Sequence, residues 1–245
     1  MTSQDYQLAP FTPEEIRIRQ LREEAIICIQ SYRGIEAIPF LQDALSIIKT
    51  NKTRWDLHFA VLRDLGRAYS QIGDIQMGLQ FQIQAFEICE DSNVKASSAA
   101  LIADEYLRSG NKEQALAYSR KSLDCAPTSL DLMSKPYQVM GGVAALEKDF
   151  VRAIKLLNQA AEYAEQSHCL TDLAMIIMDL SAVYTHLRKP ETALSEIYRA
   201  ERYVKESRNL DLYTRCAIRR ASILYQLGRD DEAKKVILGL DEQKC

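Results

Sequence analysis

Small side chains recur in this sequence about every forty residues, and this periodicity restricts the fold more than any other feature. The first set comprises Ala37, Gly78, Ala115, Ala153, Ala193 and Ala233. The second set follows seven residues later and comprises Ala44, Ala85, Ser122, Ala160, Ala200 and the larger Leu240. Seven residues are two turns of an α-helix, so both positions of a repeat lie on one helix face, where a small side chain lets a second helix pack closely. The sequence therefore predicts a tandem array of closely packed helices.

One repeat can be read in full between Leu65 and Phe86, as a helix, a glycine turn and a second helix. Its marker residues are Leu65, Gly66, Tyr69, Gly73, Gly78 and Ala85. On these residues the segment resembles a tetratricopeptide repeat. The resemblance extends over residues 14–241. The mean spacing of about 39 residues exceeds the 34 of the short form of the repeat, and it resembles the long-helix repeats of bacterial peptide-sensing regulators and eukaryotic polarity adaptors.

The resemblance implies an all-α fold, a right-handed α-solenoid of about six helix pairs whose first helices line a concave surface. We expect a flexible N-terminal segment over residues 1–12 and one superhelical domain over residues 13–241. The expected repeats span residues 14–50, 56–91, 94–127, 131–168, 171–208 and 211–241. Only nine glycines and six prolines interrupt the 245 residues, and this sparse punctuation also favours long helices.

The boundaries of the helices are predicted from turn and capping residues. We expect the two helices of a pair to be joined at Gly34, Gly73, Gly110 and Gly228, and at Lys148-Asp149 and Arg188-Lys189-Pro190 in the fourth and fifth repeats. Four aspartates near the starts of first helices are predicted to act as N-caps, because a carboxylate there accepts hydrogen bonds from free backbone N–H groups. They are Asp56, Asp131, Asp172 and Asp211.

Composition limits the compartment and the partners. The net charge is −3, with acidic and basic residues interspersed, which argues against nucleic acid as a direct partner. Six cysteines occur without a Cys-x-x-Cys pattern, as is typical of free thiols in a reducing cytoplasm. The longest apolar run, Leu173 to Met178, is far shorter than the roughly 20 residues of a membrane span, so we expect no membrane insertion.

The sequence contains no recognisable catalytic or metal-binding motif. It has no phosphate-binding glycine loop, no His-Glu-x-x-His and no Gly-x-Ser-x-Gly. His168 lies beside Cys169, but two ligands are too few for a zinc site. We therefore expect no enzyme, no cofactor and no metal. An enzyme is kept as a third alternative, only because His168 and thiols lie close in the sequence.

The resemblance implies that a partner contacts the exposed face of the first helices. The positions that match are Arg63, Arg67, Gln71, Asp104, Arg108, Gln138, Gly142, Thr185, His186, Arg219 and Ser222. Arg63 and Arg67 lie one turn apart and could grip a carboxylate with paired donors, with Arg19 and Arg22 nearby; alternatively, the arginines pair with neighbouring acids such as Asp64. Gly142 either admits a ligand backbone or permits tight packing.

These observations predict a cytoplasmic scaffold or adaptor that holds a protein or an extended peptide in its concave groove. The alternative is the peptide- or ligand-sensing domain of a bacterial transcriptional or signalling regulator. Apolar residues near the C-terminus lack a polar capping helix, so the chain is expected either to be part of a longer regulator or to have this face covered by another subunit or by the N-terminal segment of a neighbour. Our hypothesis is self-association as a homodimer through the C-terminal helix pair. The apolar residues are Val236, Ile237, Leu238 and Leu240.

Overall fold

The computed structural model describes residues 10–51, 53–125 and 130–242. These ranges contain twelve α-helices and no β-strand. The helices are α2 (Pro13–Gln30), α3 (Gly34–Thr50), α4 (Trp55–Gln71), α5 (Ile75–Ile88), α6 (Ser92–Arg108), α7 (Lys112–Asp124), α8 (Asp131–Leu146), α9 (Phe150–Gln166), α10 (Leu170–His186), α11 (Pro190–Ser207), α12 (Leu210–Gln226) and α13 (Asp230–Glu242). Most of the segment expected to be flexible, residues 1–9, lies outside the described residues.

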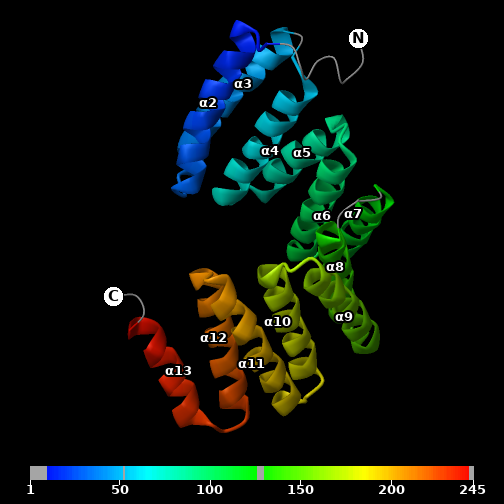
Figure 1. The fold of residues 1–245 in the computed structure, drawn as a ribbon, viewed down its shortest axis with the longest axis vertical. Helices are drawn as coiled ribbons and strands as arrows, with labels where there is room; N and C mark the ends of the chain where they lie inside the picture. The colour runs from blue at the N-terminus through cyan, green and yellow to red at the C-terminus, as the bar shows by residue number, and fades with distance from the viewer. Residues whose placement is uncertain (1–9, 52, 126–129, 243–245) are drawn as a thin grey trace. The chain divides into compact units, whose positions relative to one another are not determined.

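The twelve helices form six successive pairs, and the predicted fold class, an all-α solenoid of helix pairs, is confirmed (Figure 1). Each helix contacts the next one along the chain in α2 to α5 and in α7 to α13. First helices also contact the first helices of adjacent repeats, as α8 does with α10 and α10 with α12. This pattern is typical of a repeat array in which each pair packs mainly on its neighbours.

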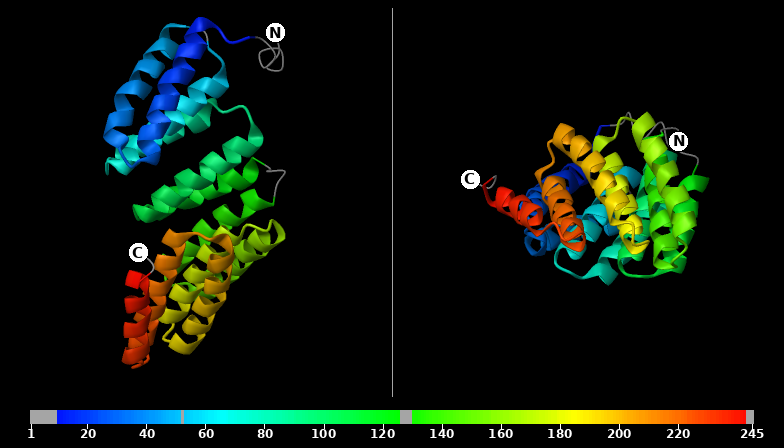
Figure 2. Two further views of the ribbon diagram at one scale, coloured as in Figure 1. Left: turned by 60° about the vertical axis from the view of Figure 1, so that its left-hand side comes forward. Right: turned by 90° about the horizontal axis from the view of Figure 1, so that it is seen from below.

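The chain divides into two compact units, residues 1–102 (unit 1) and residues 103–245 (unit 2), and the boundary falls inside α6. Each unit has its own apolar core. The core of unit 1 is built around Ile18, Leu41 and Leu65, and that of unit 2 around Leu157 and Ile177. Figure 2 shows the succession of paired helices within each unit from two further directions. The single superhelical domain predicted over residues 13–241 stays a prediction.

The turn within each pair depends on one residue with a left-handed backbone, five positions before the small residue of the second helix. In three repeats this residue is glycine, with φ of 87° at Gly73, 79° at Gly110 and 72° at Gly228. In the other three it is Tyr32, Lys148 and Arg188, with φ of 56°, 62° and 57°. The predicted turns therefore lie where expected, except that Gly34 is not the left-handed residue of the first turn.

Gly34 is instead the first residue of α3 and is buried by close packing. A Cβ atom there would lie 2.8 Å from the backbone oxygen of Ala68 and 2.9 Å from Oε1 of Gln71. The glycine is thus required by the approach of α3 to α4. The sequence signal was read as a turn because glycine serves both purposes.

The caps of the first helices also differ from the prediction. Asp56, Asp172 and Asp211 lie inside the first turns of α4, α10 and α12, whose N-caps are Arg54, Cys169 and Asn209, and Asp131 is the first residue of α8 after the N-cap Leu130. A carboxylate in the first turn still interacts favourably with the helix dipole, which explains why acids occur there. Side chains cap first helices at Thr12 and Asn209, and second helices at Asp74, Asn111 and Asp149.

Candidate functional site

Three adjoining cavities lie along the first helices of unit 2, and we call them together the unit 2 groove. The acidic cavity, of about 180 Å³, is lined by Asp104, Leu107, Gln138, Val139, Gly142, Ala145, Leu157, Asp179, Ala182, Val183, His186 and Arg219. The central cavity, of about 420 Å³, is lined by Met178, Ala182, Thr185, His186, Arg215, Ile218, Arg219, Ser222 and Ile223. The terminal cavity, of about 530 Å³, is lined by Ile218, Ala221, Ser222, Tyr225, Gln226 and Ile237.

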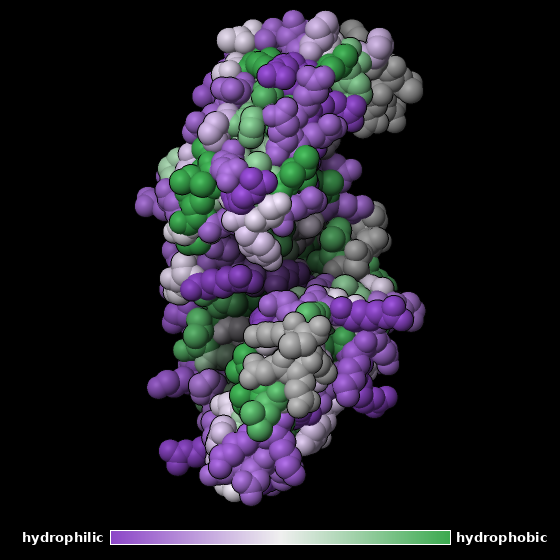
Figure 3. All heavy atoms as spheres, turned by 90° about the vertical axis from the view of Figure 1, so that its left-hand side faces the viewer, coloured by the Kyte–Doolittle hydropathy of each residue, from purple (hydrophilic) through white to green (hydrophobic). Residues whose placement is uncertain are grey.

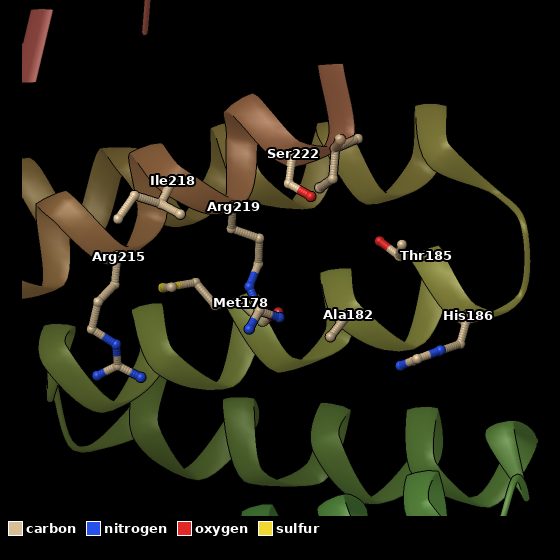
Figure 4. A pocket seen from close by; sticks show the side chains of 9 residues that line it. Met178, Ala182, Thr185, His186, Arg215, Ile218, Arg219 and Ser222 are labelled. Carbon is tan, nitrogen blue, oxygen red and sulfur yellow. The ribbon is translucent and has the colours of Figure 1, made fainter. Parts of the chain in front are cut away.

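The central cavity lies between α10 and α12, as Figure 4 shows. Residues three or four apart on a helix share a face, and the α12 side chains of Arg215, Ile218, Arg219 and Ser222 are spaced in this way. The side chain of Arg219 extends from α12 toward α10, where its NH1 donates a hydrogen bond to the backbone oxygen of Met178 at 2.9 Å (Figure 4). This bond fixes the guanidinium at the junction of the central and acidic cavities.

A chain of polar contacts crosses the acidic cavity from α6 to α10. Asp104 forms ion pairs with Arg108, whose NH2 lies 2.8 Å from Oδ2, and with Lys135, whose Nζ lies 3.2 Å from Oδ1. Lys135 also donates to Oε1 of Gln138 at 3.3 Å, and Nε2 of Gln138 donates to Oδ2 of Asp179 at 2.7 Å. Each side chain in this series of contacts orients the next one.

Asp179 lines the acidic cavity but is not among the residues predicted from the sequence. Burial raises the pKa of its carboxyl, and the negative charge of Asp104 raises it further, against the lowering effects of the hydrogen bond from Gln138 and the charges of Arg219 and Lys135. Its side chain is only partly exposed, toward the cavity. The available signal was its repeat position: Asp179 precedes Ala193 by the same 14 residues that separate Asp64 from Gly78.

The terminal cavity is mainly apolar and lies beside the predicted self-association surface. Ile237 and Leu238 expose 40% and 63% of their surface, whereas Val236 and Leu240 are half-buried. Figure 3 shows that such exposed hydrophobic side chains form small patches among mostly hydrophilic ones on the face it presents. The role of the four residues in a homodimer stays a prediction.

In unit 1 the predicted arginines surround one buried carboxylate. Oδ2 of Asp64 lies 2.6 Å from Nε of Arg22, and its Oδ1 lies 3.2 Å from NH2 of Arg63 and 3.8 Å from NH1 of Arg67. Asp64 is completely buried, whereas the side chain of Arg67 is 53% exposed. Arg19 stacks on the ring of Phe11, with its Cζ 4.0 Å from the ring centroid. This geometry corresponds to the alternative in which the arginines pair with Asp64.

Seven of the residues predicted on the concave face line the unit 2 groove. They are Asp104, Gln138, Gly142, Thr185, His186, Arg219 and Ser222. Arg108 lies beside the groove through its ion pair with Asp104. Gln71, in unit 1, donates a hydrogen bond to the backbone oxygen of Ile29 at 2.8 Å. Binding of a partner by any of these residues stays a prediction.

Gly142 permits close packing, and its contact with a ligand backbone stays a prediction. It lines the acidic cavity, but a Cβ atom there would lie 2.7 Å from Cδ2 of Leu107, so the glycine also permits close packing. Gly141 packs in the same manner against Leu157, whose Cγ would lie 2.8 Å from its Cβ.

The described residues were compared with the requirements of a metal site and of a reactive thiol. Among them, no group of three or more His, Cys, Asp or Glu side chains is placed to hold a metal ion. Burial raises the pKa of Cys216 to about 12, so this thiol is protonated at neutral pH and is a poor nucleophile.

Among the described helices, none is long and apolar enough to cross a membrane.

Comparison with known proteins supports the fold of paired helices. Residues 96–129 match the family model described as tetratricopeptide repeat. These residues form a tetratricopeptide repeat, and the rest of the described chain has the fold of an array of such repeats. The matched segment includes most of α6 and all of α7, which is the third repeat of the sequence prediction. No curated protein matches the sequence.

Several solved structures share the tetratricopeptide-repeat fold. Aspartyl phosphate phosphatase F from Bacillus subtilis has a TM-score of 0.70 and 15% identity, covering 94% of this chain and 70% of that one. A signal transduction ATPase with a tetratricopeptide repeat sensor from Pyrococcus horikoshii has a TM-score of 0.73 and 16% identity, covering 95% of this chain and 37% of that one. A Rap protein complexed with competence and sporulation factor has a TM-score of 0.63 and 14% identity, covering 94% and 76%.

Proposed function

We propose that the chain is a protein-binding scaffold whose unit 2 groove holds an extended peptide, free or as a segment of a partner protein. The observation that carries the proposal is the continuity of the groove. The acidic and central cavities share Ala182, His186 and Arg219, and the central and terminal cavities share Ile218 and Ser222. An extended peptide needs a continuous surface of this kind, because its contacts are spread along its length.

The lining of the groove suits a peptide chemically. The acidic and central cavities offer charged and hydrogen-bonding groups, such as Asp179, Arg219 and Thr185, which can meet backbone amides and polar side chains. The terminal cavity offers Tyr225 and Ile237, which can bury an apolar side chain. A few polar groups that fix orientation beside apolar surface that supplies burial are typical of ligand sites.

A display library of random decapeptides tests the proposal. Peptides that are selected on the wild-type protein should bind Ala182→Trp at least about tenfold more weakly, a loss of about 1.4 kcal/mol, because the indole fills the central cavity. Val151→Trp is the matched control, since Val151 lies on α9 outside the groove and is 83% exposed. The two affinities are measured by calorimetry. Equal binding by the two variants would show that the groove is not the site.

A second role, as a ligand-sensing domain of a regulator, is favoured by the neighbours of the fold. One neighbour is described as having a tetratricopeptide repeat sensor and another as a Rap protein complexed with competence and sporulation factor. We propose that a bound peptide would then change the conformation of the array. A change in the radius of gyration on adding a selected peptide, measured by small-angle X-ray scattering, would support sensing, and an unchanged value would support a passive scaffold.

We also propose a cytoplasmic location. Cys28, Cys125 and Cys216 are free thiols among the described residues, which fits a reducing compartment.

A further inference from the structure

Asp64 in unit 1 and Asp179 in unit 2 occupy the same position of their repeats. Each lies on a first helix, 14 residues before the small residue of the following second helix. Each also accepts a hydrogen bond from the first helix of the preceding repeat. Oδ2 of Asp64 receives Nε of Arg22 at 2.6 Å, and Oδ2 of Asp179 receives Nε2 of Gln138 at 2.7 Å. Arg22 and Gln138 are themselves equivalent, since both precede the small residue of their own repeat by 15.

The surroundings of the two carboxylates differ in charge. Around Asp64 the chain places the arginines Arg22, Arg63 and Arg67. The residues at the equivalent positions around Asp179 are Gln138, Met178 and Ala182. The positions that hold three cations around Asp64 hold three uncharged side chains around Asp179, and all three line the groove.

The cations that lie nearest to Asp179 are bound to other oxygens. Lys135 pairs with Asp104 at 3.2 Å, and NH1 of Arg219 donates to the backbone oxygen of Met178 at 2.9 Å. Within the part of the chain that the structure describes, no ion pair within 4.0 Å reaches Asp179. Burial raises the pKa of its carboxyl in spite of the charges of Arg219 and Lys135. A largely buried carboxylate without a paired cation is costly, and such groups occur preferentially at functional sites.

We propose that Asp179 binds a basic side chain of the peptide and prefers arginine to lysine. This side chain enters the acidic cavity and supplies the positive charge that Arg63 and Arg67 supply to Asp64. The proposal rests on the proposed function, because it names the part of the peptide that the groove recognises. The cavity of about 180 Å³ is several times the ~30 Å³ that one water molecule occupies in the liquid. It borders Ala182, where the equivalent residue of unit 1 is Arg67.

Arginine suits this site better than lysine for a geometric reason. Oδ2 of Asp179 already accepts from Gln138, and Oδ1 has no hydrogen bond within the described residues. A guanidinium carries several donors in one plane, so it can bond Oδ1 and a second acceptor together, whereas an ammonium acts as a point charge.

Four pentapeptide probes, acetyl-Ala-Ala-X-Ala-Ala-amide with X as arginine, lysine, citrulline or glutamate, test the proposal by NMR titration. Citrulline has the shape of arginine without its charge. The arginine peptide should bind wild-type protein at least about tenfold more tightly than the citrulline peptide, and more tightly than the lysine peptide. Its binding should also shift the side-chain amide signals of Gln138. Asp179→Asn should reduce the preference for arginine over citrulline to less than about twofold. Asp211→Asn, which makes the same charge change at an exposed position of α12, should leave it intact.

The outcomes separate this inference from the proposed function. If all four peptides bind equally and Ala182→Trp abolishes binding, the groove is the peptide site but the inference about Asp179 is overturned. If Asp179→Asn and Asp211→Asn have the same effect, the inference is likewise overturned. If the peptides bind and Ala182→Trp has no effect on them, both proposals fail.

A second measurement needs no ligand. Ala182→Arg places an arginine in the chain at the position equivalent to Arg67, where it can pair with Asp179. The substitution should raise the melting temperature at pH 7 in the wild-type background and should not raise it together with Asp179→Asn. An equal change in both backgrounds would show that the cavity does not bring a guanidinium to Asp179, and would overturn the inference.

The arginine peptide should also bind more weakly at lower pH. As pH falls through the raised pKa of Asp179, the carboxyl takes up a proton and becomes neutral, so it no longer forms an ion pair with the guanidinium. Other ionisable groups that face the cavity are Asp104 of α6, Lys135 of α8, His186 of α10 and Arg219 of α12. The contribution of these groups is the pH dependence of binding that remains in the Asp179→Asn variant. If this variant showed the same pH dependence of binding as the wild type, the proposal would be contradicted.

Discussion

Asp64 and Asp179 hold the same repeat position, and their different neighbours should give them opposite effects on stability. Asp64→Asn removes the charge that Arg22 and Arg63 bind at 2.6 and 3.2 Å. Hydrogen bonds to charged groups contribute about 1.5 to 3 kcal/mol each, and the arginines are partly exposed and can be rehydrated. We therefore expect the free energy of unfolding at pH 7 to fall by about 1 to 3 kcal/mol, as measured by urea denaturation.

Asp179→Asn should instead leave the free energy of unfolding at pH 7 unchanged or raise it. The pKa of Asp179 is raised in the folded state. A group of this kind stabilises the fold fully below its unfolded pKa, and that contribution is lost as pH rises through the folded pKa. The variant, which is neutral at every pH, should gain on the wild type as pH rises toward neutrality and match it in acid. A loss of stability at pH 7 like that of Asp64→Asn would contradict the burial argument.

The left-handed residues of the turns give another prediction at this scale. Lys148 has φ of 62°, which is unfavourable for a residue with a Cβ, so Lys148→Gly should raise the free energy of unfolding by about 1 kcal/mol. The matched control is Gly228→Ala, with φ of 72° and open space around its Cβ position. It should lower the free energy by a similar amount, because only the backbone conformation opposes the new methyl group. Both changes are measured by thermal unfolding.

At the scale of the helix pair, the small residues decide how closely two helices approach. A Cβ atom on Gly78 of α5 would lie 2.5 Å from Oγ of Ser70 and 3.0 Å from the backbone oxygen of Gly66 in α4. Gly78→Ala should therefore lower the free energy of unfolding by about 1 to 2 kcal/mol through overpacking, although alanine is the better helix former. Gly239→Ala in α13, where nothing lies within 4 Å, should raise it by up to about 1 kcal/mol. Urea denaturation of both variants distinguishes packing from helix propensity.

The periodicity of small residues predicted the helix pairs because this packing is local in sequence. Ala37, Ala115 and Ala193 are completely buried, as close helix contact requires. The identity of each capping and turning residue was less predictable. An aspartate is favourable both at an N-cap and in the first turn, and a glycine both in a left-handed turn and in a close contact. Asp56 and Gly34 were assigned the wrong one of two roles that the residue type allows.

At the scale of the whole molecule, exposed apolar residues of the last helix predict self-association. Leu238 is 63% exposed on α13, beside Ile237 and the terminal cavity. We expect the wild-type protein to be a dimer at micromolar concentration in multi-angle light scattering, and Leu238→Glu to be a monomer, because a charge would be buried in the interface. Val151→Glu, at an exposed apolar residue of α9, is the control and should remain a dimer. A monomeric mass for the wild type would contradict the prediction.

The helix faces that a partner contacts stay a prediction, whereas the amino-acid sequence alone was enough to predict the class of fold and the order of the helix pairs. It could do so because close helix packing and turn geometry act between residues near one another in the chain. It did not identify Asp179, because part of the environment of each carboxylate comes from a residue about 40 positions away on a neighbouring repeat, such as Arg22 for Asp64 and Gln138 for Asp179. The folding of α8 and α12 against α10 brings Gln138 and Arg219 beside that carboxylate, and this arrangement leaves it without an ion pair within the described residues.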